Sequence, residues 1–198
     1  MPFTIDVGTA PCPERDRGVT AASAAVRRGE LVVFPTESTY GLGADPFSAR
    51  GIERLRSAKG RGSAAPLSVL VGAVRTVEGL ATGIGAEGRA LIEAFWPGPL
   101  TLLLREQPTL AWDIAGDSGT ISVRMPLHPV ALDLLAATGP LAVTGAHRAG
   151  GVPPRDCRGA EDQLGDDVTV YLDAGPVPES LPSTVVDLTG EVPRVLRE

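Results

Sequence analysis

Two basic residues, Lys59 and Arg61, lie in a glycine-flanked segment, residues 57–62, whose chemistry suits an anion. The chain has 18 Lys and Arg against 24 Asp and Glu, and Lys59 is its single lysine. In an extended segment alternate residues share a face, so both side chains would point the same way. A compact ammonium beside a planar guanidinium suits a polyphosphate. The alternative is a pair of solvated cations that close a helix C-terminus, where positive charge is favoured.

A second candidate is the hydroxyl-rich segment 35–43, which contains Thr36, Thr39 and Tyr40 and glycines at 41 and 43. It follows the apolar run 31–34, so we expect it at a strand end, where ligands gather in α/β folds. The hydroxyls can donate to a carboxylate or a phosphate, and glycine permits close backbone approach. The alternative is a turn whose hydroxyls bond to their own backbone.

Three further segments carry polar residues at strand positions. Arg124 alternates with apolar neighbours in 121–126, which places it on the opposite face of a predicted strand from Val123. Its partner would be a carboxylate of the protein or of a ligand, and the sequence leaves both open. Segments 142–148 and 182–187 end and begin predicted strands, and each is also typical of an ordinary turn or strand start.

Several common kinds of site are excluded. The sequence has no GxxxxGK[ST] loop, no GxGxxG after a strand and no HExxH, and its two histidines and two cysteines show no metal spacing. A net charge of −6 argues against wholesale nucleic-acid coating. No apolar run reaches the ~20 residues of a membrane span. The acidic N-terminus lacks the apolar stretch of a secretory signal. We therefore expect a cytoplasmic protein without membrane contact.

The elements that must position these residues alternate irregularly. We predict helices over residues 20–28, 48–58, 85–94, 129–137 and 161–164, with Ser48 as an N-cap, and a loop over 35–46. We predict strands over 31–34, 67–71, 100–105, 120–125, 141–144, 168–172, 183–188 and 192–196. This order indicates an α/β (α+β mixed) fold: a twisted mixed β-sheet flanked by helices, with a concave ligand-binding face. We expect a single domain over 1–198, with 1–17 as an irregular N-terminal segment.

Taken together and in this order, the segments resemble one family, the threonylcarbamoyl-AMP synthases of the YrdC/TsaC-like type. The matching motifs are Pro-Thr-[Asp/Glu]-x-x-Tyr-Gly-Leu at 35–42, Lys-x-Arg at 59–61, Phe-Trp-Pro-Gly-Pro-Leu-Thr at 95–101, Val-Arg-x-Pro at 123–126 and Ser-Thr-[Ile/Val]-Val-Asp at 183–187. The likeness runs from Gly18 onward. One motif departs, because Gly145-Ala146-His147 stands where the family pattern has Ser-x-Asn. Losing one charge-assisted contact typically costs about 1.5–3 kcal/mol.

The resemblance implies a reaction in which L-threonine, bicarbonate and ATP form threonylcarbamoyl-AMP and pyrophosphate for tRNA t6A modification. It implies catalytic roles for Lys59 and Arg61. It implies phosphate-binding roles for Lys59, Arg61, Thr144, Gly145, His147 and Arg194. It implies a threonine and adenylate pocket with Thr36, Thr39, Tyr40, Arg124 and Ser183. Mg²⁺ would accompany ATP, no protein-bound metal is expected, and tRNA or tRNA-modification proteins would act downstream.

The departure at 145–147 motivates two alternatives. One is a divergent YrdC-like module that binds a nucleotide or RNA without making the adenylate. The other is a carbamoyl-transfer paralogue that serves a different acceptor. Both would lack synthase activity because the serine hydroxyl and asparagine amide are missing.

Overall fold

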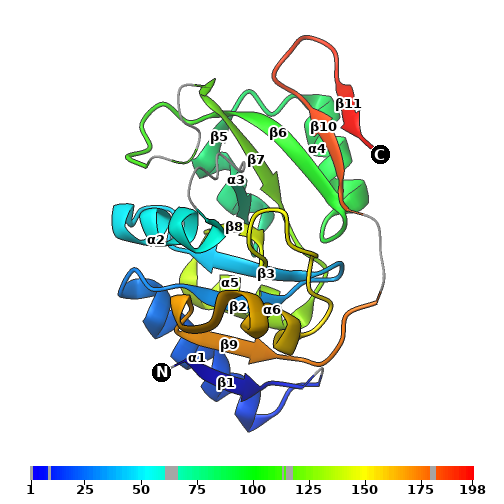
Figure 1. The fold of residues 1–198 in the computed structure, drawn as a ribbon. Coiled ribbons are helices and arrows are strands. Elements are labelled where there is room, and N and C mark those ends of the chain that lie inside the picture. Colours follow the sequence, from blue (N-terminus) through cyan, green and yellow to red (C-terminus); the bar gives the residue numbers. More distant parts are fainter. Residues whose placement is uncertain (1, 9, 61–66, 113, 115–117, 179–181) are drawn as a thin grey trace.

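The computed structural model describes residues 2–8, 10–60, 67–112, 114, 118–178 and 182–198 (Figure 1). The strands are β1 (Phe3–Asp6), β2 (Val32–Pro35), β3 (Tyr40–Ala44), β4 (Ser68–Leu70), β5 (Ala81–Thr82), β6 (Leu100–Glu106), β7 (Thr120–Arg124), β8 (Leu141–Gly145), β9 (Val170–Asp173), β10 (Thr184–Asp187) and β11 (Arg194–Arg197). The helices are α1 (Pro13–Arg27), α2 (Ala49–Lys59), α3 (Val74–Leu80), α4 (Ala86–Phe95), α5 (Pro129–Thr138) and α6 (Cys157–Leu164), followed by a 3₁₀ turn at Gly165–Asp167.

All of the described strands join one sheet in the order β1-β9-β2-β3-β8-β4-β7-β6-β10-β11, and β5 pairs with β6. Neighbours β1 and β9, β9 and β2, β4 and β7, and β6 and β10 are parallel. The remaining pairs, including β2 with β3, β3 with β8 and β8 with β4, are antiparallel. The prediction of a mixed sheet with helices on it is confirmed.

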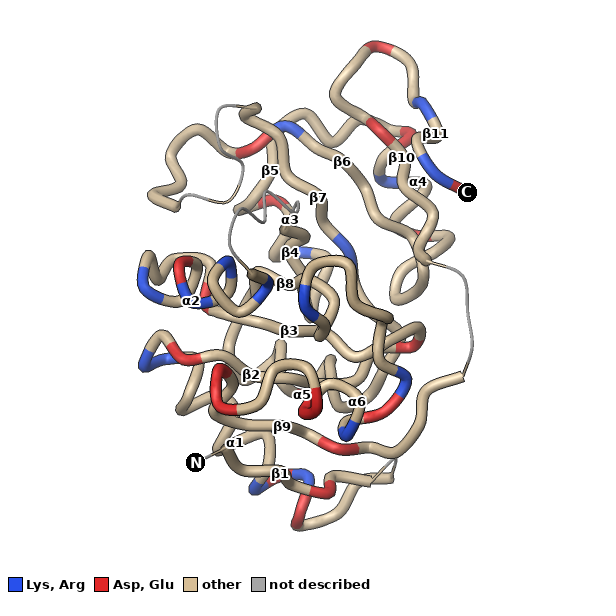
Figure 2. Tube along the Cα trace, viewed as in Figure 1, with Lys and Arg blue, Asp and Glu red and all other residues tan. Residues whose placement is uncertain are grey.

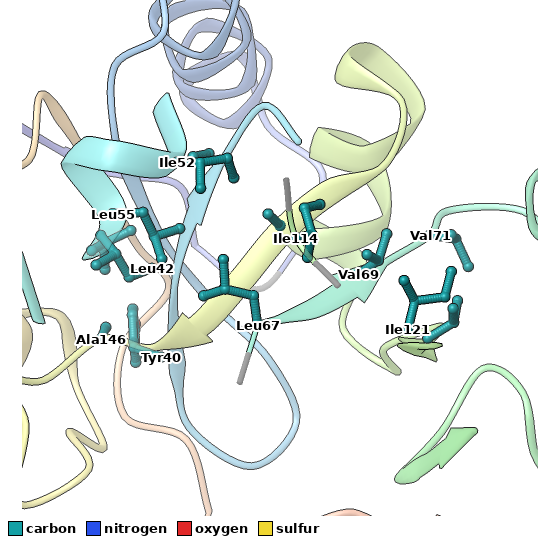
Figure 3. Packing of buried hydrophobic residues seen from close by; sticks show 14 of the residues in the cluster. Tyr40, Leu42, Ile52, Leu55, Leu67, Val69, Val71, Ile114, Ile121 and Ala146 are labelled. Atoms are coloured by element: carbon teal, nitrogen blue, oxygen red, sulfur yellow. The ribbon is translucent and has the colours of Figure 1, made fainter. Parts of the chain in front are cut away.

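The sheet separates two apolar layers, because side chains alternate across each strand. On β2, Val32 and Phe34 pack into the layer under α1 and α5, while Val33 faces the layer under α2 and α6. Figure 1 shows α1 and α5 behind the sheet, and α2 and α6 in front of it. The front layer extends to β4, where Figure 3 shows Leu67 and Val69 packing near Ile114.

Helix α2 forms as the sequence predicts. The Ser48 hydroxyl accepts a hydrogen bond from Gly51 N at 3.1 Å and caps the first turn. Ile52 and Leu55 are buried against the sheet. The helix ends at Lys59, and Gly60, which follows it, has a φ of +104° that suits glycine. This geometry places Lys59 on the last turn of α2.

Two predictions about the chain before α2 are wrong. The segment 1–17, predicted to be irregular, contains strand β1, which pairs in parallel with β9, and the start of α1 at Pro13, the favoured position for proline at a helix start. Edge strand β1 is mostly exposed, and Phe3 is 64% exposed, so its sequence carries no burial pattern. The predicted loop 35–46 contains strand β3.

Strand β3 was hidden by its glycines, which have a packing reason. A Cβ on Gly43 would lie 2.9 Å from Cε1 of the Phe34 ring, and one on Gly41 would lie 3.0 Å from Val143. The aromatic ring of β2 therefore needs a side-chain-free surface on its neighbour. Helix α3 and strand β5 are elements that the sequence reading missed, and α6 starts four residues before the predicted helix because Asp156 caps it.

None of the helices within the described ranges is long and apolar enough to cross a membrane.

Candidate functional site

The Lys59 ammonium lies where the C-terminus of α2 meets the end of β8. Only 4% of Lys59 is exposed, and Nζ donates a 2.7 Å hydrogen bond to the carbonyl oxygen of Gly145. It also donates to the carbonyl oxygen of His147. Lys59 is therefore not the solvated cation that the alternative interpretation of the 57–62 segment described. An ammonium has three N–H donors, so these two carbonyls leave one for a further acceptor.

Burial changes the protonation of this group. Removal from water disfavours the charged form and lowers the pKa of Lys59 to about 8. The ammonium still dominates at pH 7. Arg61, the other half of the predicted pair, lies outside the described residues, so the convergence of the two cations on one ligand stays a prediction.

The segment 145–147 forms a tight turn held on several sides. His147 N donates to the Gly145 carbonyl at 2.8 Å, and Ala146 N donates to the Tyr40 carbonyl at 2.9 Å. Thr144 precedes the turn on β8, opposite Leu42 of β3, and is half-buried. Figure 3 shows Ala146 beside Tyr40 at one end of the apolar cluster. The turn thus joins the ends of β3, β8 and α2.

The half-buried His147 side chain lies close to Lys59. Burial, and then the positive charge of Lys59, lower the pKa of His147. The imidazole is therefore neutral at physiological pH, with one donor and one acceptor. Its Nδ1 atom is buried and has no hydrogen-bond partner among the described residues.

The hydroxyls of the 35–43 segment bond to the protein backbone. Thr36 Oγ1 donates to the Thr39 carbonyl at 2.7 Å, and Thr39 Oγ1 donates to the Pro154 carbonyl at 2.8 Å. Tyr40 is 0% exposed, its hydroxyl donates to the Gly175 carbonyl at 2.7 Å, and burial raises its pKa. These contacts fit the structural-turn interpretation and make Tyr40 a core residue. Thr36 and Thr39 still lie near the 145–147 turn, because Tyr40, next in the chain, accepts a hydrogen bond from Ala146 N.

Arg124, at the end of β7, has a protein carboxylate as its partner. It is 9% exposed, forms an ion pair with Glu37, and its Nε donates to the Gly98 carbonyl at 3.2 Å. Glu37 also accepts a 3.2 Å hydrogen bond from Leu127 N. The ion pair fixes the 35–43 segment to β7. Sequence reasoning gave Glu37 no role, although the acidic position of its motif is the signal that could have found it.

Ser183 and Arg194 lie beside β10 and on β11. Ser183 is buried, its hydroxyl shares a 2.8 Å hydrogen bond with Thr101, and it accepts one from Arg197 at 3.3 Å. The Arg194 side chain is 73% exposed and pairs with Asp187 at 3.0 Å. None of the described hydrogen bonds or ion pairs of Ser183 and Arg194 involves the 145–147 turn. The structure therefore brings together Thr36, Thr39, Tyr40, Lys59, Thr144, Gly145 and His147, and joins Arg124 to them through Glu37. Ser183 and Arg194 have no described hydrogen bond or ion pair with this group.

The site lies next to central strands that carry no charged residues. Figure 2 shows that β2, β3 and β8 carry no charged residue, and that acidic and basic residues lie mainly on helices, loops and the outer strands. Among the described residues, no group of three or more His, Cys, Asp or Glu is arranged to hold a metal ion.

Comparison with known proteins shows the relationship directly. The Sua5/YciO/YrdC family model, described as "Telomere recombination", matches residues 24–198. A Mycobacterium tuberculosis protein provisionally named threonylcarbamoyl-AMP synthase is 50% identical over 184 residues, which is 93% of this chain and 85% of that protein. The threonylcarbamoyl-AMP synthase of Chromohalobacter salexigens is 35% identical over 178 residues, 89% of this chain and 96% of that protein.

Solved structures agree. The crystal structure of Pyrococcus abyssi Sua5 complexed with L-threonine superposes with a TM-score of 0.91 at 33% identity, over 98% of this chain and 57% of that one. The chain belongs to the Sua5/YciO/YrdC family.

Proposed function

We propose that this chain is an L-threonylcarbamoyladenylate synthase, which joins L-threonine, bicarbonate and ATP into threonylcarbamoyl-AMP and releases pyrophosphate. Relatives that match over most of their length carry this name, and a related structure binds L-threonine. These similarities favour the synthase over a binding module or a carbamoyl-transfer paralogue. The observation that carries the proposal in this chain is the buried Lys59 ammonium at the junction of α2 and β8.

The chemistry needs positioning and charge neutralisation more than a general base. The threonine amine and bicarbonate form a carbamate with loss of water. A carbamate oxygen then attacks the α-phosphorus of ATP, and the bond to the β-phosphate oxygen breaks to release pyrophosphate. Holding the two reactants together and stabilising the charge on the phosphates supplies most of the rate enhancement.

Lys59 is suited to hold those phosphates, because its charge is buried, its position is fixed by two carbonyls and one N–H remains for an anion. Arg61, two residues on, is proposed as the second cation. Thr144, Gly145 and His147 would border the phosphates, and Arg194 would close over the nucleotide from β11. Mg²⁺ is proposed to enter as MgATP, held by phosphate oxygens.

Threonine is proposed to bind near Thr36, Thr39 and Arg124. Because the Arg124 guanidinium pairs with Glu37, a threonine carboxylate would share this cation with Glu37. Ser183, beside β10, is the second candidate for that carboxylate. Tyr40 would support the pocket through its backbone and through the hydrogen bond from its hydroxyl to the Gly175 carbonyl. The product is proposed to pass to tRNA modification, and the proposed location of the reaction is the cytoplasm.

The test is pyrophosphate release from MgATP, with threonine and bicarbonate omitted one at a time. A synthase releases pyrophosphate only when both are present. Nucleotide binding without turnover would instead indicate the binding module, and turnover that needs another carbamoyl acceptor would indicate the paralogue.

A matched pair of variants tests the site. Lys59→Ala should abolish turnover, and Arg50→Ala, which removes the same charge from the exposed first turn of α2, should not. Since Lys59 also ties down the 145–147 turn, we expect Lys59→Ala to lose some stability, and circular dichroism and urea unfolding must accompany the assay.

A further inference from the structure

Gly145 and His147 are the first and third residues of the turn, and they are in direct contact. The His147 ring folds back over the Cα of Gly145. A Cβ placed on Gly145 would overlap Cε1 of the ring and lie 2.8 Å from Nδ1, inside the 3.0 Å that real Cβ contacts respect. Any side chain at 145 would therefore collide with the imidazole.

Backbone conformation does not require this glycine. Gly145 is not among the glycines with positive φ, and it lies in regular pairing with Gly41 of β3. Residues with a side chain adopt such a conformation freely. The requirement at 145 is therefore one of space, and the ring of His147 sets it.

The same two residues supply the acceptors of the Lys59 ammonium. Nζ donates to the carbonyl oxygens of Gly145 and His147 and to no other partner that the described residues reveal. The two carbonyls converge because His147 N bonds back to Gly145 O at 2.8 Å. A side chain at 145 would displace the ring, and a shift of the turn with the ring would take the His147 carbonyl away from the ammonium.

We propose that Gly145 and His147 form a matched pair that positions the Lys59 ammonium, with the imidazole filling the space that a side chain at 145 would need. This rests on the proposed function, in which Lys59 holds the nucleotide phosphates. The two departures from the Ser-x-Asn pattern are then one change. With the ring in this position a side chain at 145 does not fit, and a residue smaller than histidine at 147 makes room for serine.

The test is a double-mutant cycle on the full chain: wild type, Gly145→Ser, His147→Asn and the combined variant, each titrated with MgATP by calorimetry. Gly145→Ser alone should weaken MgATP binding by at least about tenfold, and the combined variant should recover most of that loss. Gly79→Ser is the matched control, because a Cβ at Gly79 meets nothing within 4 Å.

A second readout separates positioning from packing. The alkaline limb of kcat/KM for ATP reports the ionisation of Lys59, whose charge lies close enough to His147 to lower the pKa of the imidazole. The pH at which kcat/KM falls should shift in Gly145→Ser and return to the wild-type value in the combined variant. The proposal is overturned if Gly145→Ser binds MgATP like wild type. It is also overturned if the combined loss equals the product of the single losses, or if all four limbs coincide.

Failure of the proposed function gives a different result. A wild-type chain that does not bind MgATP removes the synthase assignment. Urea unfolding of the same four variants would then still report whether 145 and 147 are coupled. Coupling in unfolding without MgATP binding would make the pair a packing feature and would overturn its positioning role.

Discussion

Lys59 shows why a chain that otherwise uses arginine keeps one lysine. Lys59 is 4% exposed, and its ammonium lies between two carbonyl oxygens of one turn. A compact group with radially arranged donors fits such a site, whereas a planar guanidinium needs room for its fork. The same burial lowers the pKa of Lys59 to about 8. Binding of an anion by this residue is therefore sensitive to pH in a range where an ordinary lysine is not.

We expect kcat/KM for ATP to fall above pH about 8 and to approach a tenfold loss per pH unit, because the ammonium is lost as pH rises through its folded-state pKa. Pyrophosphate release at low ATP concentration between pH 7 and 10 measures this. Unfolding would not explain the loss. The folded-state pKa lies below that of the unfolded chain, so the cost of burying the charge is present below pH about 8 and is relieved above it. A flat profile to pH 10 would contradict the expectation.

The Arg124–Glu37 ion pair is the second test at the scale of single residues. The two side chains are 11% and 17% exposed, so removing one leaves the other charged and poorly hydrated. Arg124→Leu should cost roughly 3–5 kcal/mol of unfolding free energy, measured in urea. Arg124→Leu combined with Glu37→Gln should recover part of the loss. A single variant within about 1 kcal/mol of wild type would show that the pair contributes little.

At the scale of elements, the site depends on how β3 packs against its neighbours. Strand β3 runs between β2 and β8 and brings Tyr40 to the 145–147 turn. Its glycines let the Phe34 ring lie across the strand. The strand that carries the candidate threonine segment is therefore positioned by an aromatic residue on the opposite apolar layer.

Gly43→Ala should destabilise the protein by roughly 1–3 kcal/mol, because its Cβ would lie 2.9 Å from the Phe34 ring in a closely packed layer. Gly79→Ala is the control in the exposed part of α3, where a Cβ meets nothing and alanine should stabilise the helix by up to about 1 kcal/mol. Urea unfolding of both variants gives the comparison. Equal effects at the two sites would argue against the packing explanation.

At the scale of the whole molecule, an acidic chain with a net charge of −6 binds an anion only where its own fold gathers positive groups. The central strands β2, β3 and β8 are uncharged (Figure 2). The end of α2 delivers Lys59 to the edge of this neutral region. Because water is largely excluded there, an ammonium interacts with a phosphate more strongly than on the surface.

Much of this arrangement follows from local sequence signals. Ser48 and Gly60 bound α2, and short apolar runs indicated most of the strands, because caps and apolar runs are local properties of the sequence. Strand β3 was not predicted because its glycines are required by the packing of Phe34, a contact that only the folded chain makes. The ion pair of Arg124 with Glu37 and the contact of the His147 ring with Gly145 were not predicted for the same reason. The partner of a buried charge is set by the fold, not by its neighbours in the chain.

The most direct test of the account is incubation of the protein with MgATP, L-threonine and ¹³C-labelled bicarbonate, followed by mass spectrometry of the adenylate. We predict that the wild-type chain forms threonylcarbamoyl-AMP that carries one ¹³C atom, and that Lys59→Ala, folded by circular dichroism, forms none. Product formation by Lys59→Ala at the wild-type rate, or no labelled adenylate from the wild-type chain, would contradict it.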